Sequence, residues 1–269
     1  AKGIVGRALV EYFDRLGHQV IPVERNSEMT LEKAASLADI TFIVTLPIEE
    51  VAFLATRAAR VMRPGSLLMH GTSIERPVTG EIDMSHVLAR KITFCHLHFH
   101  FRPEIPLMRT LFGQHITISM QGADATKWRS WILEQLGPSQ PVIDDLEPGE
   151  HDQITSLSQV VHMVVALLVA KIWGVFPQPV VRRAMDIGGP PCRLLIRSVL
   201  RVGTGARVTE SILLNHPLTL KILDAMLAAL QGIRSVVLAR QAGVLIDQLL
   251  GARSVADPVA LKRFDQSTA

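Results

Sequence analysis

His96, His98 and His100 alternate along an apolar segment near the middle of this 269-residue chain. The composition of residues 92–100 predicts a strand, which would place the three imidazoles on one face of a sheet. An imidazole can take up a proton near neutral pH, as general base catalysis requires, and three together can bind a transition metal. Because no carboxylate or cysteine lies at a fitting distance in the sequence, proton transfer is favoured and no metal is expected.

Gly3, Ile4, Val5 and Gly6 match the end of the G-x-G-x-x-G pattern that leads from a strand into a helix beside a dinucleotide. Gly3 would let the backbone approach a pyrophosphate, and Gly6 would let the helix pack closely on the sheet. The first glycine of the pattern and its strand would precede Ala1, so we expect the numbered chain to omit upstream residues.

An acidic residue, Glu24, follows Gly6 at the distance from which a carboxylate can accept hydrogen bonds from the adenosine ribose. The next residue, Arg25, would instead favour a 2′-phosphate. Because Glu24 would repel a phosphate, NAD is the expected cofactor, while NADP stays open.

Strands and helices alternate in the pattern up to about residue 145, which is typical of a doubly wound parallel sheet. We expect strands over residues 18–24, 40–46, 66–69, 92–100 and 116–120, and helices up to 16 and over 31–38, 49–61 and 124–136. From 151 to 250 the periodicity is helical, with breaks at 177–179, 188–191 and 216–217. The sequence therefore predicts an α/β, Rossmann-like domain over residues 1–147 and an all-α substrate and dimerisation domain over 148–269.

Composition narrows the class of protein. The net charge of +3 is too small, and too little patterned with aromatic residues, to indicate nucleic-acid binding. The two cysteines, Cys95 and Cys192, are far apart and fit a reducing cytoplasm. No signal peptide is visible, and the apolar run Val160–Val169 contains His162 and is too short to span a bilayer. A cytoplasmic protein without membrane or nucleic-acid partners is expected.

Six segments, in this order and spacing, resemble the prephenate dehydrogenase family. They are GIVGRALVEYFDRLGHQV with Glu24, ADITFIVTLPIEEV, HGTSIERP, CHLHFHFRP, EHDQITSLSQVVH and PPCRLLIRSVLR. The likeness is greatest to the dehydrogenase domain of bifunctional chorismate mutase/prephenate dehydrogenases, so a fused chorismate mutase domain is an expected upstream partner. The resemblance implies NAD-dependent oxidative decarboxylation of prephenate to 4-hydroxyphenylpyruvate, a step of tyrosine biosynthesis.

The resemblance also implies the residues of the reaction. Aligning Phe101 and Pro103 with the family motif places the catalytic histidine, which accepts the hydroxyl proton, on His98. Ser73 matches a loop serine that hydrogen-bonds that histidine or the substrate hydroxyl. Leu46, Pro47 and Thr72 would lie on the nicotinamide side.

Binding of the two substrate carboxylates requires cations. Arg201 and Arg193 match arginines of the family's pocket, whereas Arg197, between them on the same stripe, has no counterpart. Gln159 and His162 are three residues apart, and His151 and His162 are nearly eclipsed on a regular helix. These three side chains are expected to line one side of the pocket.

Several residues depart from the family pattern. His70 replaces an aspartate, Glu75 replaces a substrate-facing lysine, and Arg102 lies where the motif has glycine. Arg102 can restore the positive charge lost at Glu75. Alternatively, Glu75 can pair with the ammonium of 4-amino-4-deoxyprephenate, a substrate of natural product pathways. Arogenate and a non-catalytic nucleotide-binding dimer module are further alternatives.

Long amphipathic patterns occupy residues 209–250. Their apolar faces exceed what one short domain can bury, and the resemblance implies helices that interlock two subunits. We therefore predict a homodimer.

Overall fold

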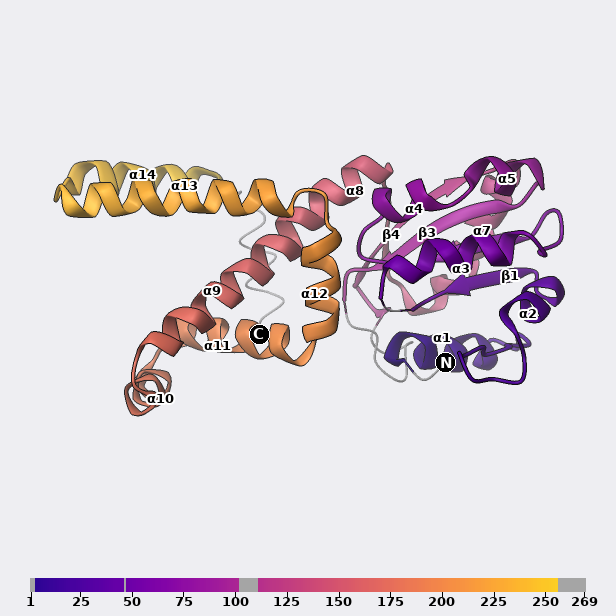
Figure 1. Ribbon diagram of the computed structural model, residues 1–269, viewed down its shortest axis with the longest axis horizontal. Helices are drawn as coiled ribbons and strands as arrows, with labels where there is room; N and C mark the ends of the chain where they lie inside the picture. Colours follow the sequence, from indigo (N-terminus) through magenta and orange to yellow (C-terminus); the bar gives the residue numbers. More distant parts are fainter. Residues whose placement is uncertain (1–2, 46, 102–110, 256–269) are drawn as a thin grey trace. The chain divides into compact units, whose positions relative to one another are not determined.

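The computed structural model describes residues 3–45, 47–101 and 111–255, and only the backbone of 249–255. Leu46 and Arg102, two of the expected site residues, lie outside these ranges. The strands, seen in Figure 1, are β1 (Ile40–Ile43), β2 (Leu67–His70), β3 (Thr93–Phe99), β4 (His115–Gln121) and β5 (Val142–Asp145). The helices are α1 (Ile4–Arg15), α2 (Leu31–Leu37), α3 (Glu49–Ala59), α4 (Arg76–Glu81), α5 (Met84–Ala89), α7 (Ala125–Leu136), α8 (Pro148–Thr155), α9 (Val161–Val175), α10 (Gln178–Ile187), α11 (Pro190–Thr204), α12 (Ala206–Asn215), α13 (Thr219–Leu238) and α14 (Ala242–Val255).

The five strands form one sheet in the order β1-β2-β3-β4-β5. The first three are parallel, β4 is antiparallel to β3, and β5 is parallel to β4. The predicted Rossmann-like α/β fold is confirmed, with a sheet that is dominated by parallel pairs rather than wholly parallel. Strand β4 was predicted, but its antiparallel direction was not, and the short strand β5 was not predicted.

Strand β3 is buried along its whole length, histidines included, as expected for an inner strand of a sheet that is covered on both faces. Its odd-numbered residues, such as Cys95 and Leu97, pack in a core with α1 and α7. The hydroxyl of Tyr12 on α1 donates a 2.7 Å hydrogen bond to the carbonyl of Gln135 on α7, which ties these two helices together. Since side chains alternate along a strand, the even-numbered histidines of β3 face away from this core.

The strand predicted over residues 18–24 is wrong. This segment is irregular, and no described strand pairs with it. An extended segment becomes a strand only through a ladder of backbone hydrogen bonds, and the described sheet ends at β1. The short helices α4 and α5 were also missed.

From Pro148 onward the described chain is helical, as predicted, and its helices end near the expected proline and glycine breaks. The change from strands to helices falls between Asp145 and Pro148, whereas the chain divides into compact units only after Thr219. A domain boundary at 147/148 therefore stays a prediction.

Helices α8 and α9 are joined by a π-helical turn, Ser156–Val160, so Pro148–Val175 is one 28-residue helical run. Its most apolar window has a mean hydropathy of 1.7 and is only 11% buried. This run is the one stretch of the described residues long and apolar enough to cross a membrane, which corrects the shorter estimate made from Val160–Val169. One such helix is weak evidence for a membrane span, and buried polar side chains at its beginning, His151 and Asp152, fit a protein interior better.

Gly122 follows β4 at φ +131°, and a Cβ added there would lie 2.9 Å from the Cα of Thr93. Because both the backbone conformation and the contact oppose a side chain, Gly122→Ala is expected to lower the free energy of unfolding by about 1–3 kcal/mol. Urea unfolding measures this loss. Gly80→Ala is the matched control, since a Cβ at Gly80 meets nothing within 4 Å. Equal stability of the two variants would contradict the prediction.

Candidate active site

A cluster of histidines lies where β2 and β3 run side by side. The parallel register pairs His70 with His96, and their ring centroids are 4.7 Å apart. Along β3 the ring centroids of His96 and His98 are 6.0 Å apart, and those of His98 and His100 are 4.3 Å apart. The expectation that the alternating histidines share one face is thus confirmed.

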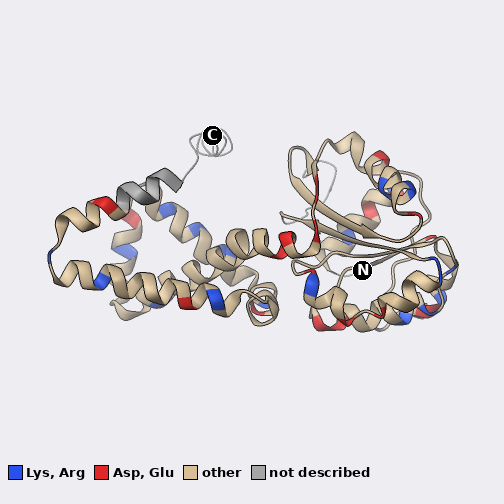
Figure 2. Cartoon of the chain, turned by 90° about the horizontal axis from the view of Figure 1, so that it is seen from above, with Lys and Arg blue, Asp and Glu red and all other residues tan. Residues whose placement is uncertain are grey.

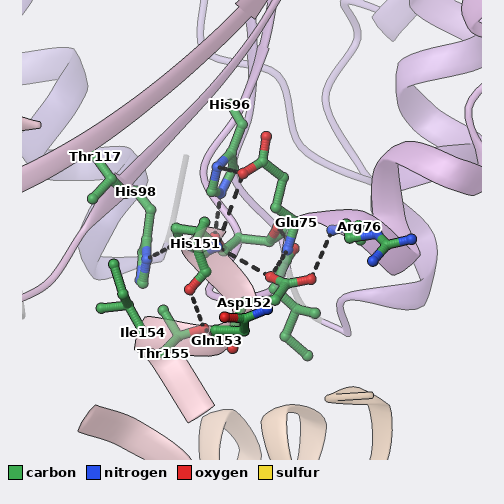
Figure 3. Close-up of polar contacts among 12 residues, drawn as sticks. Glu75, Arg76, His96, His98, Thr117, His151, Asp152, Gln153, Ile154 and Thr155 are labelled. Carbon is green, nitrogen blue, oxygen red and sulfur yellow. Dashed lines mark hydrogen bonds and ion pairs between the residues drawn. The ribbon is translucent and has the colours of Figure 1, made fainter. Parts of the chain in front are cut away.

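Helix α8 adds His151 and Asp152 to this cluster (Figure 3). The Nδ1 of His98 lies 3.0 Å from the Nε2 of His151, and the Nδ1 of His151 lies 3.1 Å from the Oδ1 of Asp152. Asp152 also accepts the backbone N–H groups of Glu75, at 2.9 Å, and Arg76, at 3.0 Å. One carboxylate therefore holds both the beginning of α4 and a chain of two imidazoles.

The hydrogen-bond partners determine which ring nitrogens of His151 and His98 carry hydrogen. A carboxylate only accepts, so the Nδ1 of His151 carries hydrogen and its Nε2 has a lone pair. That lone pair accepts the Nδ1–H of His98, which leaves the Nε2 of His98 as an acceptor. The side-chain amide of Gln159 lies 3.5 Å from that nitrogen. His98 is therefore held as a neutral imidazole with its basic nitrogen on Nε2.

Burial lowers the pKa of His98 and of His100. Desolvation, with the neighbouring His100 and His151, lowers the pKa of His98 well below its ordinary value. Burial is also the main cause that lowers the pKa of His100 to about 4. Burial acts to raise the pKa of Asp152, but hydrogen bonds from His151 and from two backbone amides outweigh it and lower this pKa. The cluster thus combines two imidazoles that resist protonation, His98 and His100, with a carboxylate, Asp152, that favours its ionised form.

A second buried pair lies behind the first. The Nε2 of His96 donates to the carbonyl of Thr72 at 2.8 Å, so its Nδ1 faces the Oε2 of Glu75, 3.1 Å away. The other oxygen of Glu75 accepts the hydroxyl of Ser119. Glu75 is only 1% exposed. Ser119 therefore satisfies one oxygen of the buried Glu75, whereas its Oε2 and the Nδ1 of His96 face each other without a hydrogen bond to any described residue.

The beginning of α1 fits a dinucleotide phosphate. Gly3 is the N-cap, and the first turn has neither a side-chain cap nor an acidic residue. A Cβ at Gly3 would meet nothing within 4 Å, and the first N–H groups of a helix have no partner within the helix. Gly6 is buried within the helix. Arg25 forms an ion pair with Glu50 of α3, which engages the cation that would favour a 2′-phosphate.

Several solved dehydrogenase structures resemble this chain over most of its length. The chain matches prephenate dehydrogenase from A. aeolicus in complex with hydroxyphenyl propionate and NAD+ at a TM-score of 0.70 and 11% identity, over 97% of this chain and 94% of that one. It matches Synechocystis arogenate dehydrogenase at 0.62 and 16%, over 93% and 96%. A putative prephenate dehydrogenase from Corynebacterium glutamicum matches at 0.67 and 16%, over 87% and 79%. The chain has the fold of the prephenate dehydrogenases. No protein-family model and no curated protein sequence matches it.

On this prephenate dehydrogenase fold, the structure brings together four of the expected site residues, His98, His151, Gln159 and Glu75. Ser73 lies in the half-buried loop after β2, but no described contact joins it to His98. Thr72 is buried, and its hydroxyl lies 3.0 Å from the Nδ1 of His70. Pro47 begins the turn before α3, next to Ile48, whose backbone N–H donates to the hydroxyl of Ser211.

His162 and the arginines lie on the helices of the prephenate dehydrogenase fold that follow α8. Burial and the nearby Arg201 of α11 lower the pKa of His162 on α9. Arg193, Arg197 and Arg201 are exposed. No described contact joins them to the histidine cluster, so their roles stay predictions.

Sequence reasoning missed four members of the cluster: His96 as a structural partner, Thr117, Ser119 and Asp152. The alternation of the histidines pointed to His96, and the acidic residue directly after His151 was a usable signal for Asp152. Thr117 and Ser119 could not be found in this way, because the antiparallel register of β4 brings them beside β3.

Proposed function

We propose that this chain is a nicotinamide-dependent dehydrogenase that oxidises a cyclohexadienyl carboxylate, with prephenate as the substrate. The observation that carries this proposal is the series of hydrogen bonds from Asp152 through His151 to His98, which leaves the Nε2 of His98 as a basic nitrogen. The reaction needs a base for the substrate hydroxyl, and a buried, neutral and oriented imidazole supplies it. The shared fold supports the same reading.

In the proposed reaction, the Nε2 of His98 accepts the proton of the ring hydroxyl as the carbon that bears it loses a hydride. The bond from the ring to its carboxylate then breaks, CO2 leaves, and the electron pair of that bond completes the aromatic ring. NAD supplies the hydride acceptor. Asp152 and His151 stabilise the positive charge that forms on His98, since each holds the next ring by a hydrogen bond.

The residues proposed to hold the cofactor are the glycine turn Gly3–Gly6, for the phosphates, and Glu24, for the ribose. The uncapped helix end suits the pyrophosphate of either cofactor, and the pairing of Arg25 with Glu50 supports NAD rather than NADP. Arg201, beside His162, is the cation proposed for a substrate carboxylate, because guanidinium groups bind carboxylates in bidentate fashion. Arg193 is proposed as a second cation.

The test is NAD reduction followed by absorbance, with prephenate, arogenate and 4-amino-4-deoxyprephenate as substrates and NADP as the alternative cofactor. Turnover of prephenate with NAD supports the proposal. Turnover of the amino compound alone would shift the proposal to Glu75, whose buried carboxylate would then pair with the substrate ammonium. Cofactor binding without turnover of any of the three would overturn the enzyme proposal and favour a binding module.

We also propose that the protein is a homodimer. The helices after β5 leave large apolar side chains exposed, including Ile172 and Val175 on α9 and, in the second compact unit, Leu227 and Val237 on α13. Figure 2 shows long stretches without charged residues along these helices. Exposed apolar surface on this scale is typical of a protein interface.

Leu227→Glu is expected to convert the dimer to a monomer, because it would place a charge in the apolar contact. The exposed fraction of Leu227 is 58%, so the change should leave the fold of one subunit intact. Light scattering coupled to gel filtration measures the mass. Lys221→Glu, at an exposed position of the same helix about 120° around its axis from Leu227, should remain dimeric. A monomeric wild-type protein would contradict the dimer proposal.

A further inference from the structure

We propose that His98, His100 and His151 also form a binding site for a divalent transition-metal ion of the zinc type, and that a metal bound there disables His98 as a base. One ring nitrogen from each of the three lies within 4.8 Å of the others. Two of the rings are buried, and His100 is partly exposed, which gives an ion a route from solvent. The metal site itself does not depend on the dehydrogenase reaction, whereas the loss of His98 as a base rests on the proposed function.

The spacing of the rings suits tetrahedral coordination. Bonds of about 2.0–2.1 Å from zinc to imidazole nitrogen place two nitrogens about 3.3 Å apart. The Nδ1 of His98 and the Nε2 of His151 are 3.0 Å apart. The ring centroids of His98 and His151 are 5.2 Å apart, and those of His100 and His151 are 5.9 Å apart. The pair formed by His98 and His151 thus already has the required spacing, and a change in the ring orientation of His100, which is only partly buried, would bring its nitrogen to bonding distance.

Each ring is held through its other nitrogen, as in established zinc sites. The Nδ1 of His151 is bonded to Asp152, at 3.1 Å, and the Nε2 of His100 lies 3.1 Å from the hydroxyl of Thr117. The Nε2 of His98 is next to the amide of Gln159. These outer contacts leave the Nε2 of His151 and the Nδ1 nitrogens of His98 and His100 for the metal.

A second group, Glu75, His96 and His151, also has ligand atoms close together. It would use the Nδ1 of His151, which is 3.9 Å from the Oε2 of Glu75. That nitrogen is already bonded to Asp152. The group is also completely buried, so we assign the ion to the three histidines.

Metal binding and proton abstraction exclude each other. The ion replaces the proton between the Nδ1 of His98 and the Nε2 of His151, and the neutral ring of His98 then carries that proton on Nε2. In this form the nitrogen can no longer accept a proton from a substrate. The Oε1 of Gln159 has no hydrogen-bond partner among the described residues, and a turn of the amide would let it accept the new N–H.

The experiment titrates the purified full chain, freed of metal with a chelator, with Co²⁺ and records its visible absorption, without substrate or cofactor. We expect one equivalent to bind with the strong absorption of a tetrahedral site, and Zn²⁺ to displace it. His100→Gln should weaken binding at least about tenfold, since even changes outside the ligand shell cost metal sites about 10- to 100-fold. His115→Gln is the matched control, because its side chain is exposed on the neighbouring strand.

Absence of stoichiometric binding would overturn the proposal, as would equal affinities of wild type and His100→Gln, provided that circular dichroism shows both to be folded. Because no substrate is present, this outcome is independent of whether the protein is a dehydrogenase. In the dehydrogenase assay, one equivalent of Zn²⁺ should abolish NAD reduction by the wild type. Full turnover with the metal bound would overturn the inhibitory part of the proposal.

Discussion

Replacing His98 by asparagine is expected to lower kcat by about 10²–10⁴-fold, the usual contribution of a positioned general base. Asparagine keeps a hydrogen-bonding side chain on the buried strand but cannot accept the substrate proton near neutral pH. The rate of NAD reduction at saturating prephenate measures the loss. Binding of NAD alone should be unchanged, because His98 is assigned to the substrate hydroxyl.

His115→Asn is the control for the loss of an imidazole. His115 lies on the adjacent strand, where its ring is exposed and paired with Asp144 at 2.8 Å. This variant should keep the wild-type kcat. If His98→Asn also kept it, a different group would have to be the base, and the assignment would be wrong.

Asp152→Asn is expected to lower kcat by about 10²-fold or more and to reduce the free energy of unfolding by about 1–3 kcal/mol. The two oxygens of Asp152 accept three hydrogen bonds, from His151 and from the amides of Glu75 and Arg76. Asparagine has one acceptor oxygen, so its NH₂ group must face a buried N–H on one side. If it faces His151, the protons of both rings reverse and the Nε2 of His98 becomes a donor.

Two measurements separate the catalytic from the structural part of this effect. NMR of the ring nitrogens reports which nitrogen of His98 carries hydrogen, and urea unfolding reports stability. Asp144→Asn, at the exposed pair with His115, is the matched control and should change neither. An Asp152→Asn enzyme with normal kcat and unchanged ring protonation would show that Asp152 serves only to hold α4.

The strands at the core of the sheet were predictable from sequence because buried strands are enriched in apolar residues. The apolar segments at β1 and β3 were correctly predicted to be strands, although β1, at the edge of the described sheet, is mostly half-buried and only β3 is fully buried. Alternation correctly placed His96, His98 and His100 on one face. By contrast, the segment 18–24 has the composition of a strand but no described ladder partner. Which strands pair depends on the whole sheet, so the composition of a segment cannot show whether it has a partner. For the same reason the composition of β4 could not show that this strand runs antiparallel to β3.

The site was less predictable, because its contacts depend on register. The spacing of His151, Gln159 and His162 was interpreted on a regular α-helix of about 100° per residue. The π turn Ser156–Val160 lies between the first and last of them. Gln159 reaches His98, at 3.5 Å, whereas His162 lies near Arg201. A π turn has no strong sequence signature, so counting residues could not have separated the two.

The π turn Ser156–Val160 changes the angular positions of side chains around the helix axis without interrupting the helix. A single extra residue in a helix sets everything after it back by about 100° relative to what precedes it. The direction of the apolar face of α9 around the helix axis therefore does not follow from the direction of His151 by regular α-helical spacing, although one unbroken helix carries both. Removing one residue between 156 and 160 would restore ordinary winding and rotate the apolar face of α9 relative to His151. The number of residues between α8 and α9 thus determines how the polar side chains of α8 and the apolar side chains of α9 are oriented relative to each other, whatever the composition of either helix.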